Sequence, residues 1–304
     1  MKIVVVGPGV IGSIYGCLLA RSGHDVTLIA RGRRLADLQK YGLVLEDADA
    51  GQRTEMSLPV LDKLSPDDRY DLVLVSVRSE QFATTLPMIN GMGDGSDVLM
   101  FGNTTGNQNE LITALGERAL FGFPAAGGIQ DGPIVRYVLI KQQRTMLGEA
   151  DGTSTTRIHR LRTMFGDAGF RTKASANIGG WMIGHSAFVV PIALALYRFD
   201  TNAASLAADA RTLRLMVLAT QDAFEALDDV EIPANLRWLY LRTPTAFAVR
   251  YWRRVFASPR GELWFGAHSR AAPDEMHALA AELRAAVQKT GRPTPHFDAL
   301  VGTR

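Results

Sequence analysis

Three glycines near the N-terminus have the spacing of a loop that binds phosphates. Gly7, Gly9 and Gly12 follow an apolar run, residues 3–6, at the spacing G-x-G-x-x-G, and a helical pattern continues to Ser22. In such a loop the first glycine makes the tight turn, the second leaves room for a pyrophosphate, and the third lets the helix approach the sheet. The N–H groups that begin the helix then face the phosphates. We therefore predict that a dinucleotide contacts this loop, at Gly7, Pro8, Gly9, Val10, Ile11 and Gly12.

The end of the next predicted strand, residues 25–30, indicates which dinucleotide binds. Folds that prefer NAD commonly have an acidic residue there, which accepts hydrogen bonds from the ribose 2′-hydroxyl. Here the chain reads Arg31-Gly-Arg-Arg34, with no carboxylate. Guanidinium groups suit a 2′-phosphate, so we expect NADP as the cofactor, with Arg31 and Arg34 among its ligands. A solvated basic loop is the alternative.

Two further apolar runs, residues 70–77 and 97–101, read as buried parallel strands. In a doubly wound sheet, the loops that follow the carboxyl ends of the strands face the ligand. We therefore expect residues 76–81 and 102–106 to lie near the glycines, and ordinary turn chemistry is the alternative. The cofactor contacts expected in these loops are Val77, Arg78, Gln81, Asn103 and Thr104.

The elements that must position these residues change in character along the chain. Strands are predicted at residues 119–123, 134–140 and 145–149, with a glycine-rich bend at 125–132, a pair of short strands within 43–59, and helices at 35–41 and 154–166. Beyond residue 178 the periodicity is helical, at residues 181–199, 203–227, 236–256 and 274–290. The predicted fold is an α/β, Rossmann-type doubly wound sheet followed by an all-helical domain. We place the boundary between residues 1–173 and 174–304.

Composition excludes several classes of function. The 304 residues carry a formal net charge of +2, which gives no electrostatic reason to expect nucleic acid as a partner. The single cysteine, Cys17, excludes an intramolecular disulfide and a cysteine-rich metal site, and we expect no metal. Residues 181–199 approach the length of a membrane span but include His185 and Pro191, so we expect a core helix and no membrane partner. No signal sequence is recognised, and we expect a cytoplasmic protein.

Together these features resemble the ketopantoate reductase family of NADPH-dependent enzymes, which reduce a 2-oxo acid to a 2-hydroxy acid. The similar segments are the glycine loop, Arg31, Val75-Ser-Val-Arg-Ser-Glu-Gln81, Asn103-Thr-Thr-Gly106, Leu147-Gly-Glu149 and Pro293-Thr-Pro295. The resemblance implies a C-terminal domain like that of 6-phosphogluconate dehydrogenase, which closes over NADPH around a small-molecule substrate. It also makes a homodimer, formed through the helical domain, a candidate assembly.

The catalytic half departs from this resemblance. In the family, a lysine two residues after a tryptophan protonates the nascent alkoxide. Trp181 is present, but Ile183 occupies the lysine position, or Met182 if the register moves by one. A positioned acid contributes about 10² to 10⁴ in rate, so either another group, with His185 nearest, supplies the proton, or the substrate needs none, as with a protonated imine. A histidine that only packs in the core or cleft is the alternative for His185.

A second catalytic candidate follows from the resemblance. Glu262 lies in Ser258-Pro-Arg-Gly-Glu-Leu-Trp-Phe-Gly266, similar to a family segment whose glutamate hydrogen-bonds the substrate hydroxyl, and a solvated loop glutamate is the alternative. The candidate catalytic residues are therefore His185, Glu262 and Asn103. Arginines in Arg250-Tyr-Trp-Arg-Arg254 either clamp a carboxylate or face solvent, and Tyr240 and His268 are further candidates for the cleft. An NADP(H)-binding sensor or interaction protein without turnover is the alternative function.

Overall fold

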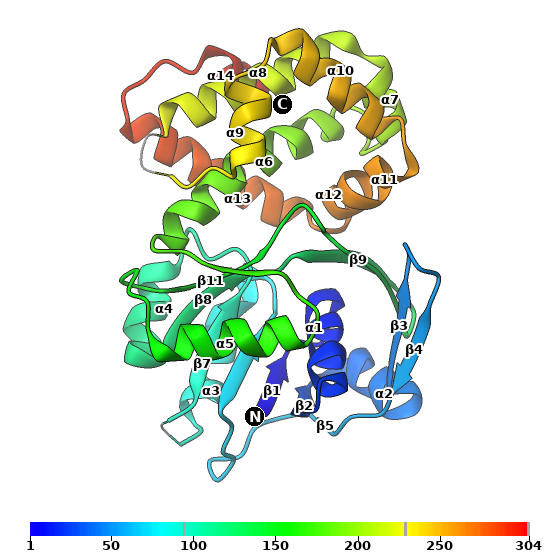
Figure 1. Cartoon of the computed structure of the whole chain (residues 1–304), viewed down its shortest axis with the longest axis vertical. Helices are drawn as coiled ribbons and strands as arrows, with labels where there is room; N and C mark the ends of the chain where they lie inside the picture. The colour runs from blue at the N-terminus through cyan, green and yellow to red at the C-terminus, as the bar shows by residue number, and fades with distance from the viewer. Residues whose placement is uncertain (94, 228–229, 303–304) are drawn as a thin grey trace. The chain divides into compact units, whose positions relative to one another are not determined.

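The computed structural model describes residues 1–93, 95–227 and 230–302, apart from the side chains of Arg260, Leu263, His268 and Ala271. Its contacts divide the chain into two compact units, Met1–Ile178 and Gly179–Arg304 (Figure 1). The first is an α/β unit built on a mostly parallel sheet and the second is helical, which confirms the predicted fold class. The boundary expected at residue 173 falls within β12 (Thr172–Ala174), a strand that pairs with β11 of the first unit.

An eight-stranded sheet forms the centre of the N-terminal unit, in the order β12-β11-β8-β7-β6-β1-β2-β5. Only β8 and β11 are antiparallel neighbours. Strands β1, β6 and β7 are almost wholly buried, because apolar side chains fill both faces of a sheet covered on each side. The strands are β1 (Lys2–Val6), β2 (Asp25–Ile29), β5 (Val60–Leu61), β6 (Leu72–Val75), β7 (Asp97–Phe101), β8 (Ala119–Phe123), β11 (Thr145–Glu149) and β12.

A smaller sheet of four strands, β4-β3-β10-β9, completes this unit. Helix α1 (Val10–Arg21) contacts strands of both sheets and lies between them (Figure 1). Ser13, Tyr15 and Cys17 of α1 are therefore all buried. The strands are β3 (Leu43–Asp47), β4 (Arg53–Met56), β9 (Ala126–Asp131) and β10 (Ile134–Leu139).

Strand β9 corrects one prediction. Residues 125–132 were expected to form a bend because of their glycines, yet they form a strand that pairs with β10 along its whole length. Gly128 lies so close to the backbone of Arg136 and Tyr137 that an added Cβ would clash there. The glycine therefore permits a close approach of two strands, which is one of its established uses within a sheet.

An ion-pair network attaches α5 (Thr156–Asp167) to the sheet. The carboxylate of Glu149, at the end of β11, accepts hydrogen bonds from Thr155 Oγ1 and from Arg157 Nε, the latter at 2.8 Å. Arg157 Nη1 also donates to Asp97 Oδ1 at 3.1 Å, and Arg160 Nη2 donates to the other oxygen of Asp97 at 2.5 Å. The remaining helices of this unit are α2 (Gly32–Tyr41), η1 (Ser79–Gln81), α3 (Phe82–Asn90), α4 (Gln108–Leu115) and η2 (Gly116–Arg118).

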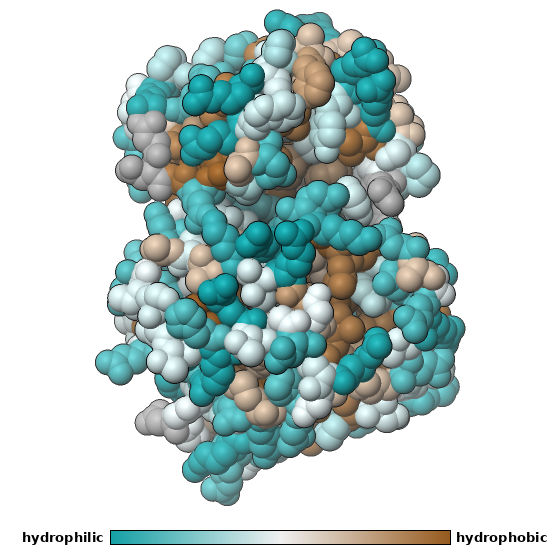
Figure 2. Space-filling model, viewed as in Figure 1, coloured by the Kyte–Doolittle hydropathy of each residue, from teal (hydrophilic) through white to brown (hydrophobic). Residues whose placement is uncertain are grey.

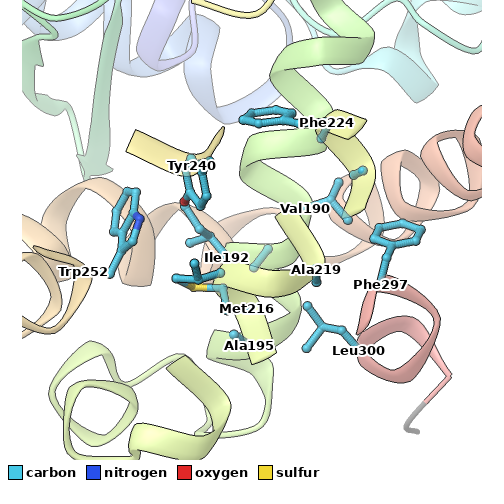
Figure 3. Packing of buried hydrophobic residues seen from close by; sticks show 14 of the residues in the cluster. Val190, Ile192, Ala195, Met216, Ala219, Phe224, Tyr240, Trp252, Phe297 and Leu300 are labelled. Atoms are coloured by element: carbon cyan, nitrogen blue, oxygen red, sulfur yellow. The ribbon is translucent and has the colours of Figure 1, made fainter. Parts of the chain in front are cut away.

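The helical unit packs around α6 (Ile178–Tyr197). This helix is apolar and long enough to cross a membrane, but 61% of its apolar window is buried in the structure. Val190, Ile192 and Ala195 of α6 pack with side chains of α8 and α14, as Figure 3 shows. The other elements are α7 (Ala203–Ala208), α8 (Ala210–Ala226), α9 (Ala234–Leu241), α10 (Thr245–Phe256), α11 (Pro259–Gly261), the π-helical turn η3 (Glu262–Gly266), α12 (Ala267–Ala271), α13 (Pro273–Lys289) and α14 (Pro295–Val301).

Two predicted helices are each divided in the structure. The helix expected over residues 203–227 breaks at Asp209, whose Oδ1 accepts a hydrogen bond from Thr212 N at 2.7 Å and so caps α8. The helix expected over residues 236–256 breaks before Pro244, which has no N–H to continue a helix and instead caps α10.

Candidate active site

The register of the parallel strands brings four loops to one edge of the sheet. Val6, the last residue of β1, pairs with Ile29 of β2 and with Val75 of β6, and Val75 pairs with Met100 of β7. The segments that follow these strands therefore leave the sheet side by side. They contain the glycine loop, Arg31, the residues from Ser76 to Gln81, and Asn103 with Thr104.

The three glycines of the loop have different surroundings. Gly7 has φ of +84°, in the left-handed region, and an added Cβ would clash with Val77 Cγ1. A Cβ on Gly12 would meet Ser76 Oγ and would lie 2.5 Å from Gly7 O. A Cβ on Gly9 would meet no atom within 4 Å. Gly7 and Gly12 are thus required by packing, whereas Gly9 leaves open space beside the backbone.

Hydrogen bonds hold this loop in place. The carbonyl oxygen of Gly7 accepts from Gly9 N at 2.8 Å and from Ser76 Oγ at 2.9 Å. The first i→i−4 bond of α1 runs from Ser13 N to Gly9 O, so the N–H groups of Val10, Ile11 and Gly12 precede the helical ladder. These groups lie at the positive end of the helix dipole. Such N–H groups, beside the open space at Gly9, fit a pyrophosphate.

The three arginines after β2 have different roles. Arg31 is the N-cap of α2, and its exposed guanidinium is 3.8 Å from the sulfur of Met88. Arg33 is exposed, with Nε 3.9 Å from Asp37. Arg34 instead points into the glycine loop, where Nε donates to Pro8 O and Nη2 donates to Ser13 Oγ, both at 2.8 Å. The first turn of α2 has no acidic residue.

The other predicted cofactor contacts lie at the same edge. Val77 is half-buried against Gly7, and Arg78 begins the 3₁₀ turn η1, where its backbone N–H donates to Gln81 Oε1 at 3.4 Å. Asn103 is half-buried and Thr104 is buried, just beyond β7. These residues come from separate parts of the sequence, and the sheet places them around one loop.

His185 is half-buried on α6, one helical turn beyond Trp181. Their rings are stacked, with centroids 5.2 Å apart and planes inclined by 10°. The ring of Phe188 lies edge-on to the imidazole, with centroids 6.4 Å apart. Ile183 packs against the hydrophobic core of this unit. Helix α6 contains no Lys, Arg, Asp or Glu, so His185 is its one histidine among apolar and small neutral side chains.

Glu262 forms an ion pair at the start of the π-helical turn. Its Oε1 accepts a hydrogen bond from Arg270 Nη2 at 2.6 Å, and its Oε2 accepts one from Ala203 N at 3.4 Å. Arg270 Nε also donates to Thr201 Oγ1 at 3.0 Å. The glutamate thus joins η3 to the beginning of α7, while its side chain keeps 45% of its surface exposed.

The remaining candidates in the helical unit differ in surroundings. Tyr240 is fully buried between Phe224 and Trp252 and is therefore a core residue. Its burial raises the pKa of its hydroxyl well above the usual range. The side chain of His268 lies outside the described residues. Of the three candidate catalytic residues, Asn103 belongs to the N-terminal unit, whereas His185 and Glu262 belong to the helical unit.

Helices α9 and α10 carry a basic, aromatic face. The rings of Trp238 and Phe247 pack edge to face, with centroids 5.9 Å apart. Both residues are about half exposed, as is Tyr251. Residues 232–261 contain six arginines and no acidic residue. Five of these arginines are exposed in the structure: Arg237, Arg242, Arg250, Arg253 and Arg254. Their exposure agrees with the solvent-facing alternative for the arginines of α10.

The surface of the N-terminal unit is apolar over α1. Val10, Ile11 and Leu18 are half-buried there, and brown side chains gather over this helix between hydrophilic neighbours (Figure 2).

Across the described part of the chain, no cluster of three or more His, Cys, Asp or Glu side chains could hold a metal ion.

Two hydroxyl groups hold the glycine loop: Ser13, which the sequence analysis did not name, and Ser76, which it expected near the glycines only as part of residues 76–81. Ser13 and Ser76 both donate to carbonyl oxygens of the glycine loop, at Pro8 and Gly7 respectively. Ser13 follows the glycine motif directly, which was an available signal. Ser76 lies about seventy residues away, and the pairing of β1 with β6 brings it to the loop, as expected for residues 76–81.

Comparisons with known proteins agree with this arrangement. Residues 3–152 match the family model described as ketopantoate reductase PanE/ApbA. The chain is 31% identical over 183 residues to 2-dehydropantoate 2-reductase of Pyrococcus horikoshii, a match that covers 60% of this chain and 58% of that protein. The matched region thus spans less than two thirds of the curated relative.

Solved structures match the fold over nearly the whole chain. The 2-dehydropantoate 2-reductase of Geobacter metallireducens has a TM-score of 0.78 at 20% identity, covering 99% of this chain and 98% of that one. A ternary structure of D-mandelate dehydrogenase with NADH and anilino(oxo)acetate has a TM-score of 0.76 at 17% identity, covering 99% and 96%. Ketopantoate reductase PanE/ApbA is therefore the family of residues 3–152, the part of the chain that holds the glycine loop and the sheet edge.

Proposed function

We propose that this protein is an NADPH-dependent oxidoreductase of the ketopantoate reductase type, which reduces a 2-oxo acid or a related carbonyl or imine compound. The observation that carries the proposal is the ordered glycine loop after β1, with open space at Gly9 and the N-terminus of α1 behind it. The family match over the same residues supports it.

The chain's own residues would hold the cofactor at two points. The N–H groups of Val10, Ile11 and Gly12 would bind the pyrophosphate, which carries the negative charge that a helix N-terminus favours. The exposed guanidinium groups of Arg31 and Arg33, beside the N-terminus of α2, would bind a 2′-phosphate. When bound, the nicotinamide of NADPH supplies the hydride.

Thermal unfolding with each cofactor tests the choice of NADPH. We expect NADPH to raise the melting temperature far more than NADH at equal concentration, because a ligand that binds only the folded state stabilises it by mass action. Equal shifts from the two cofactors would contradict the role given to Arg31, and the absence of any shift would contradict the whole proposal.

The proton required by a reduced carbonyl is assigned to His185. Hydride delivery leaves negative charge on the carbonyl oxygen, so an acid near that atom stabilises the transition state. On α6 the position compared with the family's lysine is Ile183, which is half-buried and packs against the core, and the half-buried His185 is two residues further along. We further assign Glu262 and Asn103 to substrate binding.

A substrate panel separates this proposal from a sensor without turnover. Oxidation of NADPH would be followed at 340 nm with oxo acids, aldehydes and imines. Rapid consumption that depends on one of these compounds supports the reductase. Tight NADPH binding with no oxidation across the panel would favour the sensor instead.

A further inference from the structure

We infer that Arg34 is a positioning residue of the glycine loop and that it does not recognise the 2′-phosphate. The choice between NADPH and NADH then rests on Arg31 and Arg33, although all three arginines belong to one basic segment. This inference deepens the proposed function and rests on it, since it concerns how the same cofactor site is built.

The guanidinium of Arg34 is part of a closed ring of hydrogen bonds. Nε donates to Pro8 O at 2.8 Å, Nη2 donates to Ser13 Oγ at 2.8 Å, and Ser13 Oγ donates to Pro8 O at 2.9 Å. A guanidinium suits this geometry, because its planar fork presents two donors in fixed directions. Two of its three nitrogens are therefore already engaged by the protein.

This ring determines the direction of a peptide group in the loop. A peptide unit is planar, so fixing the carbonyl oxygen of Pro8 also fixes the direction of the N–H of Gly9. That N–H donates to Gly7 O, which Ser76 holds from the other side. Arg34 thus links α2 to the loop and, through Ser13, to the first turn of α1.

Burial distinguishes Arg34 from its neighbours. Arg31 and Arg33 are exposed, whereas Arg34 is half-buried, with its Nη1 shielded from solvent. Arginine stays charged in proteins, so its positive charge lies beside the loop whichever cofactor is present. NADPH and NADH share the pyrophosphate and differ only at the 2′ position. A group that orders the loop must therefore affect the binding of both equally.

The test compares dissociation constants for NADPH and NADH, measured by the fluorescence of the reduced nicotinamide. Arg34→Leu should weaken both cofactors by the same factor, at least fivefold, and leave the ratio of the two constants unchanged. Arg31→Leu should weaken NADPH at least tenfold, leave NADH unchanged, and so reduce the ratio. Arg34→Lys, which keeps the charge but lacks the fork, should resemble Arg34→Leu.

Ser13→Ala provides a second test if Arg34→Leu does not fold. It removes one member of the ring and should also weaken both cofactors equally, by a smaller factor. A changed NADPH to NADH ratio in Arg34→Leu, Arg34→Lys or Ser13→Ala would overturn the inference while leaving the proposed function intact. Failure of the wild-type protein to bind either cofactor would instead overturn the proposed function.

Discussion

The imidazole of His185 is stacked on the indole of Trp181, with ring centroids 5.2 Å apart and planes 10° from parallel. The two residues are four positions apart on α6, so the helix itself places one ring over the other. The stack restricts the imidazole plane, and Phe188 contacts its edge. A side chain held in this way is suited to deliver a proton in one direction.

We therefore predict that His185→Ala lowers turnover at saturating NADPH by at least tenfold, with an unchanged dissociation constant for NADPH. The loss reflects the contribution of a positioned acid, about 10² to 10⁴ in rate at most sites. Tyr197→Phe is the matched control on the same helix and should leave turnover unchanged. The Tyr197 hydroxyl already donates to Ser269 O at 2.9 Å, and burial raises its pKa to about 12, so it is not available as an acid. An unchanged rate in His185→Ala would remove this residue from the mechanism.

Substitutions of Gly12 and Gly9 should have separate effects, the first on folding and the second on cofactor binding. Gly12→Ala places a methyl group against Ser76 and the Gly7 carbonyl, so we expect a lower melting temperature without ligand. Gly9→Ala meets no protein atom within 4 Å, so its melting temperature without ligand should match that of the wild type. Its methyl group would occupy the space given to the pyrophosphate, and the stabilisation by NADPH should be lost. A full NADPH shift in Gly9→Ala would contradict the placement of the phosphates.

Removal of Arg157 should destabilise the N-terminal unit strongly. The side chain of Glu149 is only 5% exposed, and Arg157→Leu would leave its charge without its main partner. Breaking a buried pair on one side costs about 3 to 5 kcal/mol, and we expect a loss near the lower limit because Arg157 is partly exposed. Urea denaturation would measure it. Arg160→Leu, whose side chain is 51% exposed, is the control and should cost less than about 1 kcal/mol.

Stability at alkaline pH should depend on Cys17. Burial raises the pKa of its thiol to about 11, against the opposing effect of Arg21. The folded state thus holds the thiol proton more tightly than the unfolded state. This contribution is fully present below the ordinary thiol pKa of 9.0 and is lost as the pH rises towards 11.

The comparison with Cys17→Ala isolates this effect from other alkaline groups. Between pH 9 and 11 the free energy of unfolding of the wild type should fall more steeply than that of the variant, by up to about 1.4 kcal/mol per pH unit. Equal slopes for the two proteins would show that the thiol ionises alike in both states.

Much of the sheet edge could be predicted because its signals are local. The apolar runs that form β1, β2, β6 and β7 are each followed by glycine or polar residues, and the parallel arrangement follows from the helices between them. Strand β9 could not be found in this way, because its glycines resemble a turn until they pair with β10. Local propensity fails where a partner strand determines the conformation.

The sequence also could not assign the three arginines separately. Arg31, Arg33 and Arg34 have the same chemistry, and only the fold shows that Arg34 meets Pro8, 26 residues earlier in the chain. Likewise, the pairing of Glu262 with Arg270 and Ala203 depends on how two segments of the helical unit pack. The breaks at Asp209 and Pro244, by contrast, carried ordinary capping and proline signals.

The segment of residues 232–261 makes the charge of this protein uneven along its sequence. Since residues 232–261 contribute +6 and the whole chain only +2, the other residues together carry −4. The chain therefore has a local cationic region despite a net charge near zero. On a cation-exchange matrix it should be retained through the arginines of this segment. At low salt it should bind more strongly than a protein of equal net charge with evenly spread arginines.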